Sequence, residues 1–288
     1  MRFAHVIPAG TSVPRLIAVE QDAGAFVDGF FAGAPSTLDA LIAGGDELLD
    51  RVRDAAPRAS FDVPLQDAAF ASAILAPPVI LAVGLNYAAH SSELGLKTDA
   101  TPTVFVLWPN SLSGHEGTTT WPRALSEAVD YEAELGVIIG RDAKDVSAEA
   151  ALSHVWGYTV VNDITARNIQ YSEAQWSRCK SFDGFTPTGP FVVTADEIPD
   201  PQDLHIWTVL DGKTLQDGST GQMVRTVATL ISSLSQSATL LPGTLISTGS
   251  PGGAGYSRDP QIFLRDRSTV TVGIDGIGAL TTHCRIVD

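Results

Sequence analysis

Three acidic residues stand where they could bind one hard metal ion. Glu132 and Glu134 lie two residues apart in the strand-like run Asp130-Tyr-Glu-Ala-Glu-Leu-Gly-Val-Ile-Ile-Gly140, so both side chains should leave the same face of a sheet. Asp163 ends a second apolar, β-branched run, Gly157-Tyr-Thr-Val-Val-Asn-Asp. Neighbouring carboxylates repel unless a cation lies between them, and all-oxygen ligands favour Mg²⁺ or Mn²⁺, with Ca²⁺ as an alternative, over zinc. The competing interpretation is an exposed polar strand edge, with Asp163 capping the helix that follows.

A histidine and a glutamate form a candidate general base. His90 and Glu93 stand three residues apart after the strand-like run Val79-Ile-Leu-Ala-Val83 and its terminating Gly84. On one helical turn they would share a face, and the carboxylate could orient and polarise the imidazole for removing a proton from water. A weak, exposed surface pair is the alternative interpretation.

Short strands and few helices should position these groups. In residues 1 to 75 we expect strands at Arg2–Val6, Arg15–Val19 and Ala25–Val27 and helical periodicity from Leu38 to Ala55. This segment holds no constellation of reactive groups, and Pro77-Pro78 marks a boundary. We therefore predict a small N-terminal α/β domain at residues 1–75 and a larger domain at residues 76–288.

The last third of the chain also indicates a mostly β structure. The run Leu204–Leu210 followed by Asp211-Gly212 predicts a hairpin, and Met223–Leu234 has the spacing of an amphipathic helix. A strand at Thr244–Thr248 should lead into a glycine-rich loop, and the closing residues 269–287 should form a strand pair. The fold class expected is α+β, mostly β.

Composition restricts the class of partner. A net charge of −15 argues against nucleic acid and anionic membranes, both of which attract basic surfaces. No apolar run approaches the length of a membrane span, and two cysteines cannot form a disulfide framework. These features predict a cytoplasmic protein that acts on a small molecule.

Six segments occur in an order and spacing that resemble the fumarylacetoacetate hydrolase (FAH) family over roughly residues 75 to 285. They are Val83-Gly-Leu-Asn-Tyr-Ala-Ala-His-Ser-Ser-Glu93, Asp130–Gly140, Gly157–Arg167, Lys180-Ser-Phe-Asp-Gly184, Gly189-Pro190 and Thr248-Gly-Ser-Pro-Gly-Gly253. Each segment alone is unspecific, whereas the six in series are specific.

The resemblance implies a role for each matching position. It implies metal ligands at Glu132, Glu134 and Asp163, and a catalytic dyad at His90 and Glu93 on a segment that closes over the substrate. Lys180 matches a lysine that reaches toward the metal and the substrate oxygens, and the matching substrate-binding positions are Arg167, Gln170, Thr248 and Ser250. The resemblance also implies an FAH-like catalytic domain with a rolled mixed β-sheet, and a homodimer.

The expected reaction is metal-dependent hydrolysis of a C–C bond in an acylpyruvate-type 1,3-dicarbonyl acid through a metal-bound enolate. Decarboxylation of oxaloacetate and tautomerisation of a 2-oxo acid use the same enolate and remain alternatives, as does a non-catalytic dimeric scaffold with a structural metal. Leu107 stands where the family typically has lysine, which weakens the case for a small dianionic substrate.

Overall fold

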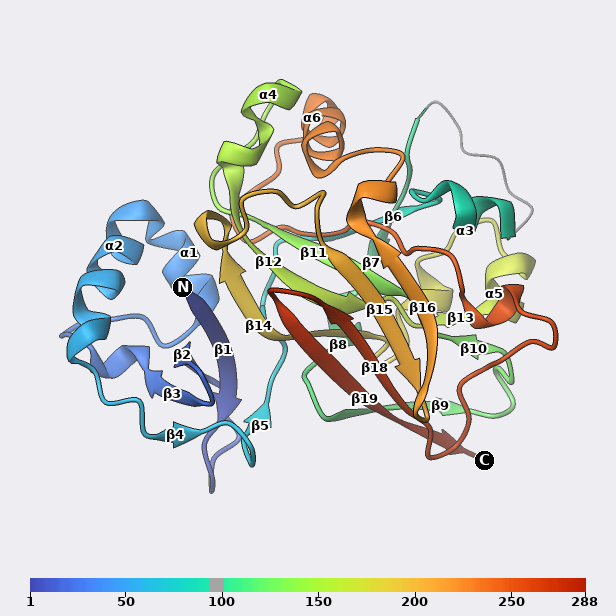
Figure 1. Ribbon diagram of the computed structural model, residues 1–288, viewed down its shortest axis with the longest axis horizontal. Coiled ribbons are helices and arrows are strands. Elements are labelled where there is room, and N and C mark those ends of the chain that lie inside the picture. The colour runs from blue at the N-terminus through green and yellow to red at the C-terminus, as the bar shows by residue number, and fades with distance from the viewer. Residues whose placement is uncertain (94–100) are drawn as a thin grey trace.

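The computed structural model describes residues 1–93 and 101–288 and shows a mostly β protein built on one large mixed sheet (Figure 1). The strand order in that sheet is β4-β3-β2-β1-β14-β12-β11-β17-β6-β7, with β5 on β1 and β8 on β14. These strands are β1 (Arg2–Ile7), β2 (Arg15–Glu20), β3 (Ala23–Phe26), β4 (Val63–Pro64), β5 (Ala69–Phe70), β6 (Ile80–Gly84), β7 (Thr103–Leu107), β8 (Leu112–Ser113), β11 (Ala133–Ile139), β12 (Val155–Asn162), β14 (Thr186–Thr194) and β17 (Leu245–Ser247). The mostly β fold class expected from the sequence is confirmed.

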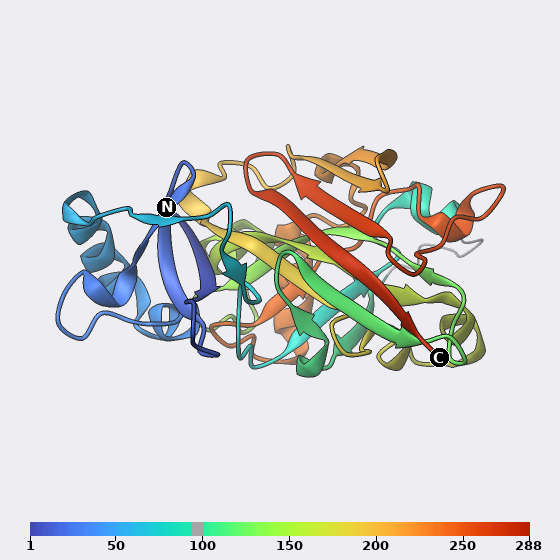
Figure 2. The same cartoon turned by 90° about the horizontal axis from the view of Figure 1, so that it is seen from below.

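A second sheet packs against the first. Its strands, in the order β16-β15-β18-β19-β9, are β16 (Lys213–Ser219), β15 (His205–Leu210), β18 (Thr269–Ile274), β19 (Gly278–Val287) and β9 (Gly117–Pro122). β11 and β12 contact β15 and β18 across the layers, and the long β19 crosses the molecule diagonally in Figure 2. The largest apolar core cluster combines residues of both sheets, including Leu135, Val160, Ile206 and Val272. This packing fixes the face of β11 that carries the acidic residues.

The N-terminal strands continue the large sheet rather than standing apart from it. Arg2 pairs with Val193 and Phe3 with Val192, so β1 lies beside β14. Helices α1 (Leu38–Ala43) and α2 (Gly45–Ala55) lie beside these strands. The helical periodicity from Leu38 to Ala55 is thus divided into two helices at Gly44, and Gly45, with φ of +65°, begins the second. The division of the chain at residue 75 stays a prediction.

Among the described residues after position 75, the α-helices are α3 (Ala88–Glu93), α4 (Ala148–Ala151), α5 (Arg167–Ser172) and α6 (Val227–Ser237). α6 starts later than the spacing from Met223 predicted, because the side chain of Thr226 accepts a hydrogen bond from the backbone N–H of Thr229 and so caps the helix there. The hairpin between β15 and β16 turns at Asp211 and Gly212, as expected, and both residues have positive φ.

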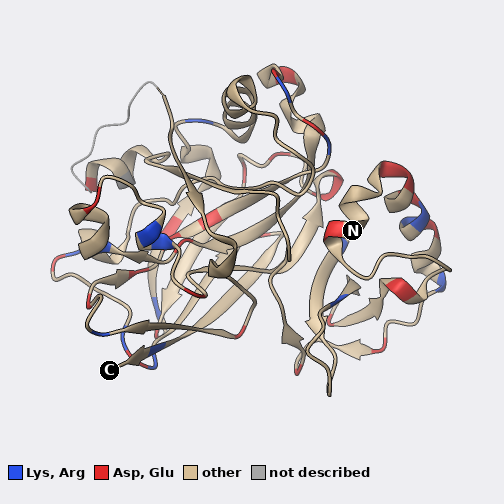
Figure 3. Cartoon of the chain, turned by 180° about the vertical axis from the view of Figure 1, so that it is seen from behind, with Lys and Arg blue, Asp and Glu red and all other residues tan. Residues whose placement is uncertain are grey.

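Charge is distributed along the whole chain. Acidic residues appear from α2 to the strands of the large sheet, as a net charge of −15 requires (Figure 3). The helices of residues 1–93 and 101–288 all fall short of the length and apolar character that a membrane span needs.

Candidate metal and active site

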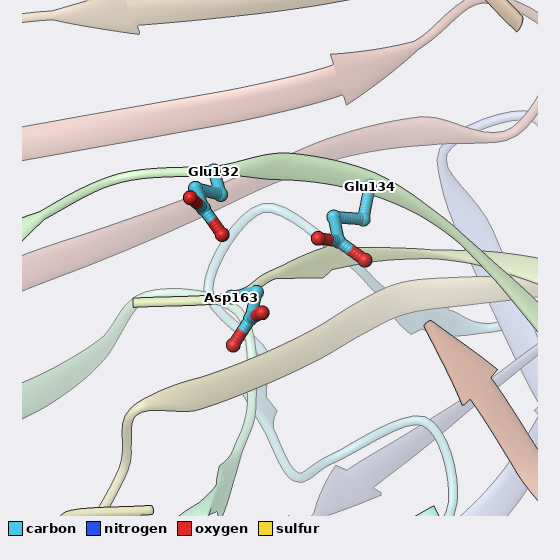
Figure 4. Close-up of side chains that lie close together, drawn as sticks. All are labelled: Glu132, Glu134 and Asp163. Carbon is cyan, nitrogen blue, oxygen red and sulfur yellow. The ribbon is translucent and has the colours of Figure 1, made fainter. Parts of the chain in front are cut away.

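Glu132, Glu134 and Asp163 converge in the structure. Each offers a carboxylate oxygen, and the three oxygens lie within 4.8 Å of one another (Figure 4). Glu134 is in β11, Glu132 immediately precedes that strand, and Asp163 immediately follows the neighbouring strand β12. The backbone N–H of Asp163 donates to the carbonyl of Glu132 at 2.9 Å, which holds the two strand ends in register.

The cluster is buried, so the interpretation as an exposed strand edge was wrong. The three residues are 4%, 2% and 1% exposed in the order Glu132, Glu134, Asp163. Burial, followed by repulsion from Asp163 and Glu132, raises the pKa of Glu134 to about 8. Burial likewise raises the pKa of Asp163, against the lowering effect of Lys180. The site therefore stores electrostatic repulsion that a cation would relieve.

Lys180 partly neutralises the cluster. Its Nζ donates to Glu132 Oε2 at 2.7 Å, to Asp163 Oδ2 at 2.5 Å and to Thr165 Oγ1 at 2.8 Å. Burial alone would lower the pKa of this lysine, but Asp163 and Glu132 raise it above its usual value, so the side chain stays charged. Lys180 therefore ties two of the predicted ligands together.

Arg167 is the second buried cation of the site. The guanidinium is fully buried and bonds Glu132 Oε1 at 2.6 Å, Asp130 Oδ2 at 2.9 Å and Gln170 Oε1 at 2.9 Å. Arg167 therefore pairs with two of the acids in the run from Asp130 to Glu134. Its expected role in holding a substrate carboxylate, shared with Gln170, stays a prediction.

Asp130 is a site residue that the sequence analysis quoted without assigning it a role. It is fully buried, and besides Arg167 its carboxylate accepts from the backbone N–H groups of Gly255 and Tyr256 at 2.8 and 3.0 Å. The signal was present in the alternation of acids at positions 130, 132 and 134. Asp130 therefore connects the loop after β17 to Arg167, which also bonds Glu132.

The glycine-rich loop after β17 holds Glu134 in place. Glu134 Oε2 accepts from Ser247 Oγ at 2.5 Å and from the backbone N–H of Gly249 at 2.8 Å. Gly249 has φ of +97°, and a side chain there would lie 2.8 Å from Cβ of Asn86, so glycine is required for the loop to approach the carboxylate this closely.

The two predicted substrate contacts of this loop differ. Thr248 is fully buried and its hydroxyl donates to the carbonyl of Leu135 at 2.9 Å, whereas Ser250 lines a small cavity of about 10 Å³. The polar residues around that cavity are Glu132, Glu134, Asp163, Gln170, Lys180 and Ser250. The cavity thus brings together the three predicted metal ligands, the predicted catalytic Lys180 and two predicted substrate-binding residues, Gln170 and Ser250.

The dyad of His90 and Glu93 is only half described. Both residues belong to α3, but the His90 side chain lies outside what the structure describes. The Glu93 carboxylate accepts from the backbone N–H of Gly253 at 3.0 Å and from Ser257 Oγ at 3.1 Å, so it connects α3 to the glycine-rich loop. Its orientation of His90 stays a prediction.

Leu107 and Trp176 define the apolar surroundings. Leu107 is 1% exposed in the core cluster that also contains Ile80 and Phe105, and it is not among the residues that line the cavity. Trp176 does line it and packs edge-on against Phe105, with ring centroids 5.5 Å apart. Trp176 therefore forms part of the cavity wall, whereas Leu107, the departure from the family pattern, does not.

Comparison with known proteins supports this description. A protein of Burkholderia ambifaria, named only in general terms as a hydrolase, is 45% identical over 200 residues, which is 69% of this chain and 71% of that protein. The crystal structure of maleylpyruvate hydrolase from Sphingobium sp. SYK-6, in complex with manganese(II) and pyruvate, matches with a TM-score of 0.83 and 25% identity, covering 100% of both chains.

A 5-carboxymethyl-2-hydroxymuconate delta-isomerase from Mycobacterium smegmatis matches with a TM-score of 0.77 and 29% identity, again over 100% of both chains. Residues 79–285 match the profile of the fumarylacetoacetate (FAA) hydrolase C-terminal domain. The chain belongs to the fumarylacetoacetate hydrolase family.

Proposed function

We propose that this protein is a divalent-metal-dependent hydrolase that cleaves a C–C bond of an acylpyruvate-type 1,3-dicarbonyl acid. The observation that carries the proposal is the charge of the site. When all are ionised, the four buried carboxylates of Asp130, Glu132, Glu134 and Asp163 face two buried cations, Arg167 and Lys180, which leaves an excess of two negative charges. One divalent ion balances that excess.

The donor set fits a hard cation. The ligands are carboxylate oxygens, and Asp163 Oδ1 is a buried atom with no hydrogen-bond partner in the described residues, so a group that can accept a cation is already in place. Mg²⁺ and Mn²⁺ are the ions proposed, because three side chains leave positions open for water or substrate in a six-coordinate shell. Open positions favour catalysis over a purely structural ion.

A cation bound there supplies Lewis acidity, which polarises a carbonyl oxygen and stabilises negative charge that develops on it. Lys180 and Arg167 hold Glu132 and Asp163 in position and add positive charge beside the cavity. We assign His90 as the base that removes a proton from the attacking water, and the proton then goes to the enolate carbon as pyruvate forms.

Hydrolysis is preferred over isomerisation and over decarboxylation, with one reason for each. The matched maleylpyruvate hydrolase binds manganese(II) and pyruvate, a product expected from acylpyruvate cleavage. His90 also gives this chain a base for water, which decarboxylation does not require. The matched isomerase keeps tautomerisation as the second candidate, because both reactions pass through an enolate.

The test is turnover of acetylpyruvate, fumarylpyruvate and oxaloacetate by the purified protein with Mg²⁺ or Mn²⁺, with product analysis. We expect pyruvate plus a carboxylic acid, loss of turnover of 100-fold or more in His90→Ala, and loss of both turnover and metal binding in Glu132→Ala. The exposed Glu127→Gln is a matched control that should retain activity. Full turnover in His90→Ala would reject the base assignment, and isomerised substrate without cleavage would favour the tautomerase.

A further inference from the structure

Gln216, from the second sheet, bonds Ser250, which lines the cavity beside the three acids. It lies in β16, is fully buried, and its side chain makes four hydrogen bonds. Oε1 accepts from the backbone N–H of Ala133 at 3.0 Å and from Thr208 Oγ1 at 2.7 Å. Nε2 donates to the carbonyl of Pro251 and to Ser250 Oγ, both at 2.8 Å. All four bonding positions of the amide are therefore used.

Two backbone groups fix which way this amide points. The N–H of Ala133 can only donate, so it must face the oxygen of Gln216, and the carbonyl of Pro251 can only accept, so it must face the nitrogen. Ala133 separates the two predicted ligands Glu132 and Glu134. Reversing the amide would set two donors against each other and two acceptors against each other, which buried groups do not tolerate.

The fixed amide determines the orientation of the Ser250 hydroxyl. Because Nε2 of Gln216 donates to Ser250 Oγ, the serine oxygen accepts on that side and its own proton must point elsewhere. Ser250 is 2% exposed, and its hydroxyl donates to no residue in the described part of the chain. Ser250 lines the cavity together with the three carboxylates, so that proton is available to a ligand there.

We propose that Gln216 is a positioning residue that holds the Ser250 hydroxyl as a hydrogen-bond donor to an oxygen of the bound 2-oxo acid. The inference deepens the proposed function and rests on it. A donor fixed before the substrate arrives needs no reorientation when negative charge develops on the oxygen. Thr248 cannot act in this way from its present position, because its proton is already bonded to Leu135.

The test is a double-mutant cycle of Gln216→Met and Ser250→Ala, read by calorimetric titration of the Mn²⁺-loaded protein with oxalate. Oxalate is a planar dianion with the shape of pyruvate enolate. We expect each single change to weaken oxalate binding about tenfold, the effect of one hydrogen bond to a charged group. The double variant should be within about twofold of Ser250→Ala alone, because Gln216 acts through that hydroxyl.

Two further variants separate this role from a loss of folding. Gln216→Glu keeps the side-chain shape but replaces the donor by an acceptor that draws the serine proton away from the cavity, so it should bind oxalate as weakly as Ser250→Ala. Its melting temperature and Mn²⁺ affinity are measured alongside, because the new acceptor also faces the carbonyl of Pro251. Thr208→Val removes a hydrogen bond to Oε1 and leaves Nε2 in place, so its melting temperature should fall while oxalate affinity stays at the wild-type level.

The inference would be overturned if the losses of oxalate affinity of Gln216→Met and Ser250→Ala add fully in the double variant, or if Gln216→Glu binds oxalate as tightly as wild type. Either result would leave the proposed function standing. An unmutated protein that binds neither Mn²⁺ nor oxalate would overturn both.

Discussion

Replacing Glu134 by glutamine should stabilise the metal-free protein and remove most of its stabilisation by divalent ions. The side chain is buried, and its Oε2 accepts from Ser247 Oγ and from the backbone N–H of Gly249. An amide oxygen can accept both bonds, so the substitution keeps the local structure and changes only the charge. With every acid of the site ionised, the buried excess of negative charge falls from two in the wild type to one in the variant.

The size of the effect follows from the pKa of this carboxyl, which rises from the ordinary 4.5 to about 8 in the folded protein. At pH values between 4.5 and 8, Glu134 keeps its proton in the folded state and releases it in the unfolded chain. The free energy of unfolding therefore falls as the pH rises through this range. One pKa unit corresponds to about 1.4 kcal/mol, which gives a cost of about 3 kcal/mol at pH 7 that the glutamine variant lacks. Near pH 4.5 the difference should vanish.

A divalent ion should remove most of this difference in stability. Ion present at 100 times its dissociation constant stabilises the wild-type protein by about 3 kcal/mol, and the variant should lose most of this gain with one ligand gone. Urea unfolding followed by circular dichroism, at pH 5 and pH 7.5, in EDTA and in Mn²⁺, measures all four cases. The exposed Glu127→Gln should behave like wild type in each.

A glutamine variant that is no more stable than wild type in EDTA at pH 7.5 would contradict the electrostatic cost assigned to Glu134. Equal stabilisation of both proteins by Mn²⁺ would contradict its role as a metal ligand.

Three further outcomes are expected, two from the acidic site and one from the N-cap of α6. The affinity for Mn²⁺, measured by calorimetry, should rise by up to about tenfold per pH unit between pH 6 and 8, because binding must displace the proton of Glu134; an affinity independent of pH would contradict this. Lys180→Met should lower the free energy of unfolding in EDTA by about 3–5 kcal/mol, since it removes the cation between Glu132 and Asp163. If urea titrations show a loss no larger than that of the control Glu127→Gln, the ion pairs of Lys180 do not stabilise the fold. Thr226→Ala should cost about 1 kcal/mol by removing the N-cap of α6 and leave Mn²⁺ affinity unchanged, and an altered affinity would show that α6 reaches the site.

Local patterns predicted the elements of this fold better than their arrangement. The alternation in the run from Asp130 to Gly140 predicted β11, and the turn residues Asp211-Gly212 predicted a hairpin. The order of the strands depends on contacts distant in sequence, such as β1 beside β14, and no local pattern carries that information. The start of α6 was missed because helical spacing extended back to Met223, whereas the cap at Thr226 decides where the helix begins.

The candidate site was predictable as a set of positions and not as a set of contacts. Spacing and family resemblance indicated Glu132, Glu134 and Asp163, and the structure brings these three together. Gln216 gave no signal, because it lies in a hairpin strand more than 80 residues from Glu134 and looks like any polar residue there.

The charge balance shows why contacts matter for the chemistry. Arg167 and Lys180 both bond Glu132, one at each carboxylate oxygen, so two cations share one predicted ligand. Glu134 is held instead by a serine hydroxyl and a backbone N–H, which donate hydrogen bonds without bringing a positive charge. When Glu134 is ionised, the uncompensated charge therefore lies at this carboxylate, beside Asp163, whose Oδ2 bonds Lys180 and whose Oδ1 lacks a partner in the described residues. A cation is attracted most strongly to that side, and removing Glu134 should weaken its binding even though Glu132 keeps both of its ion pairs.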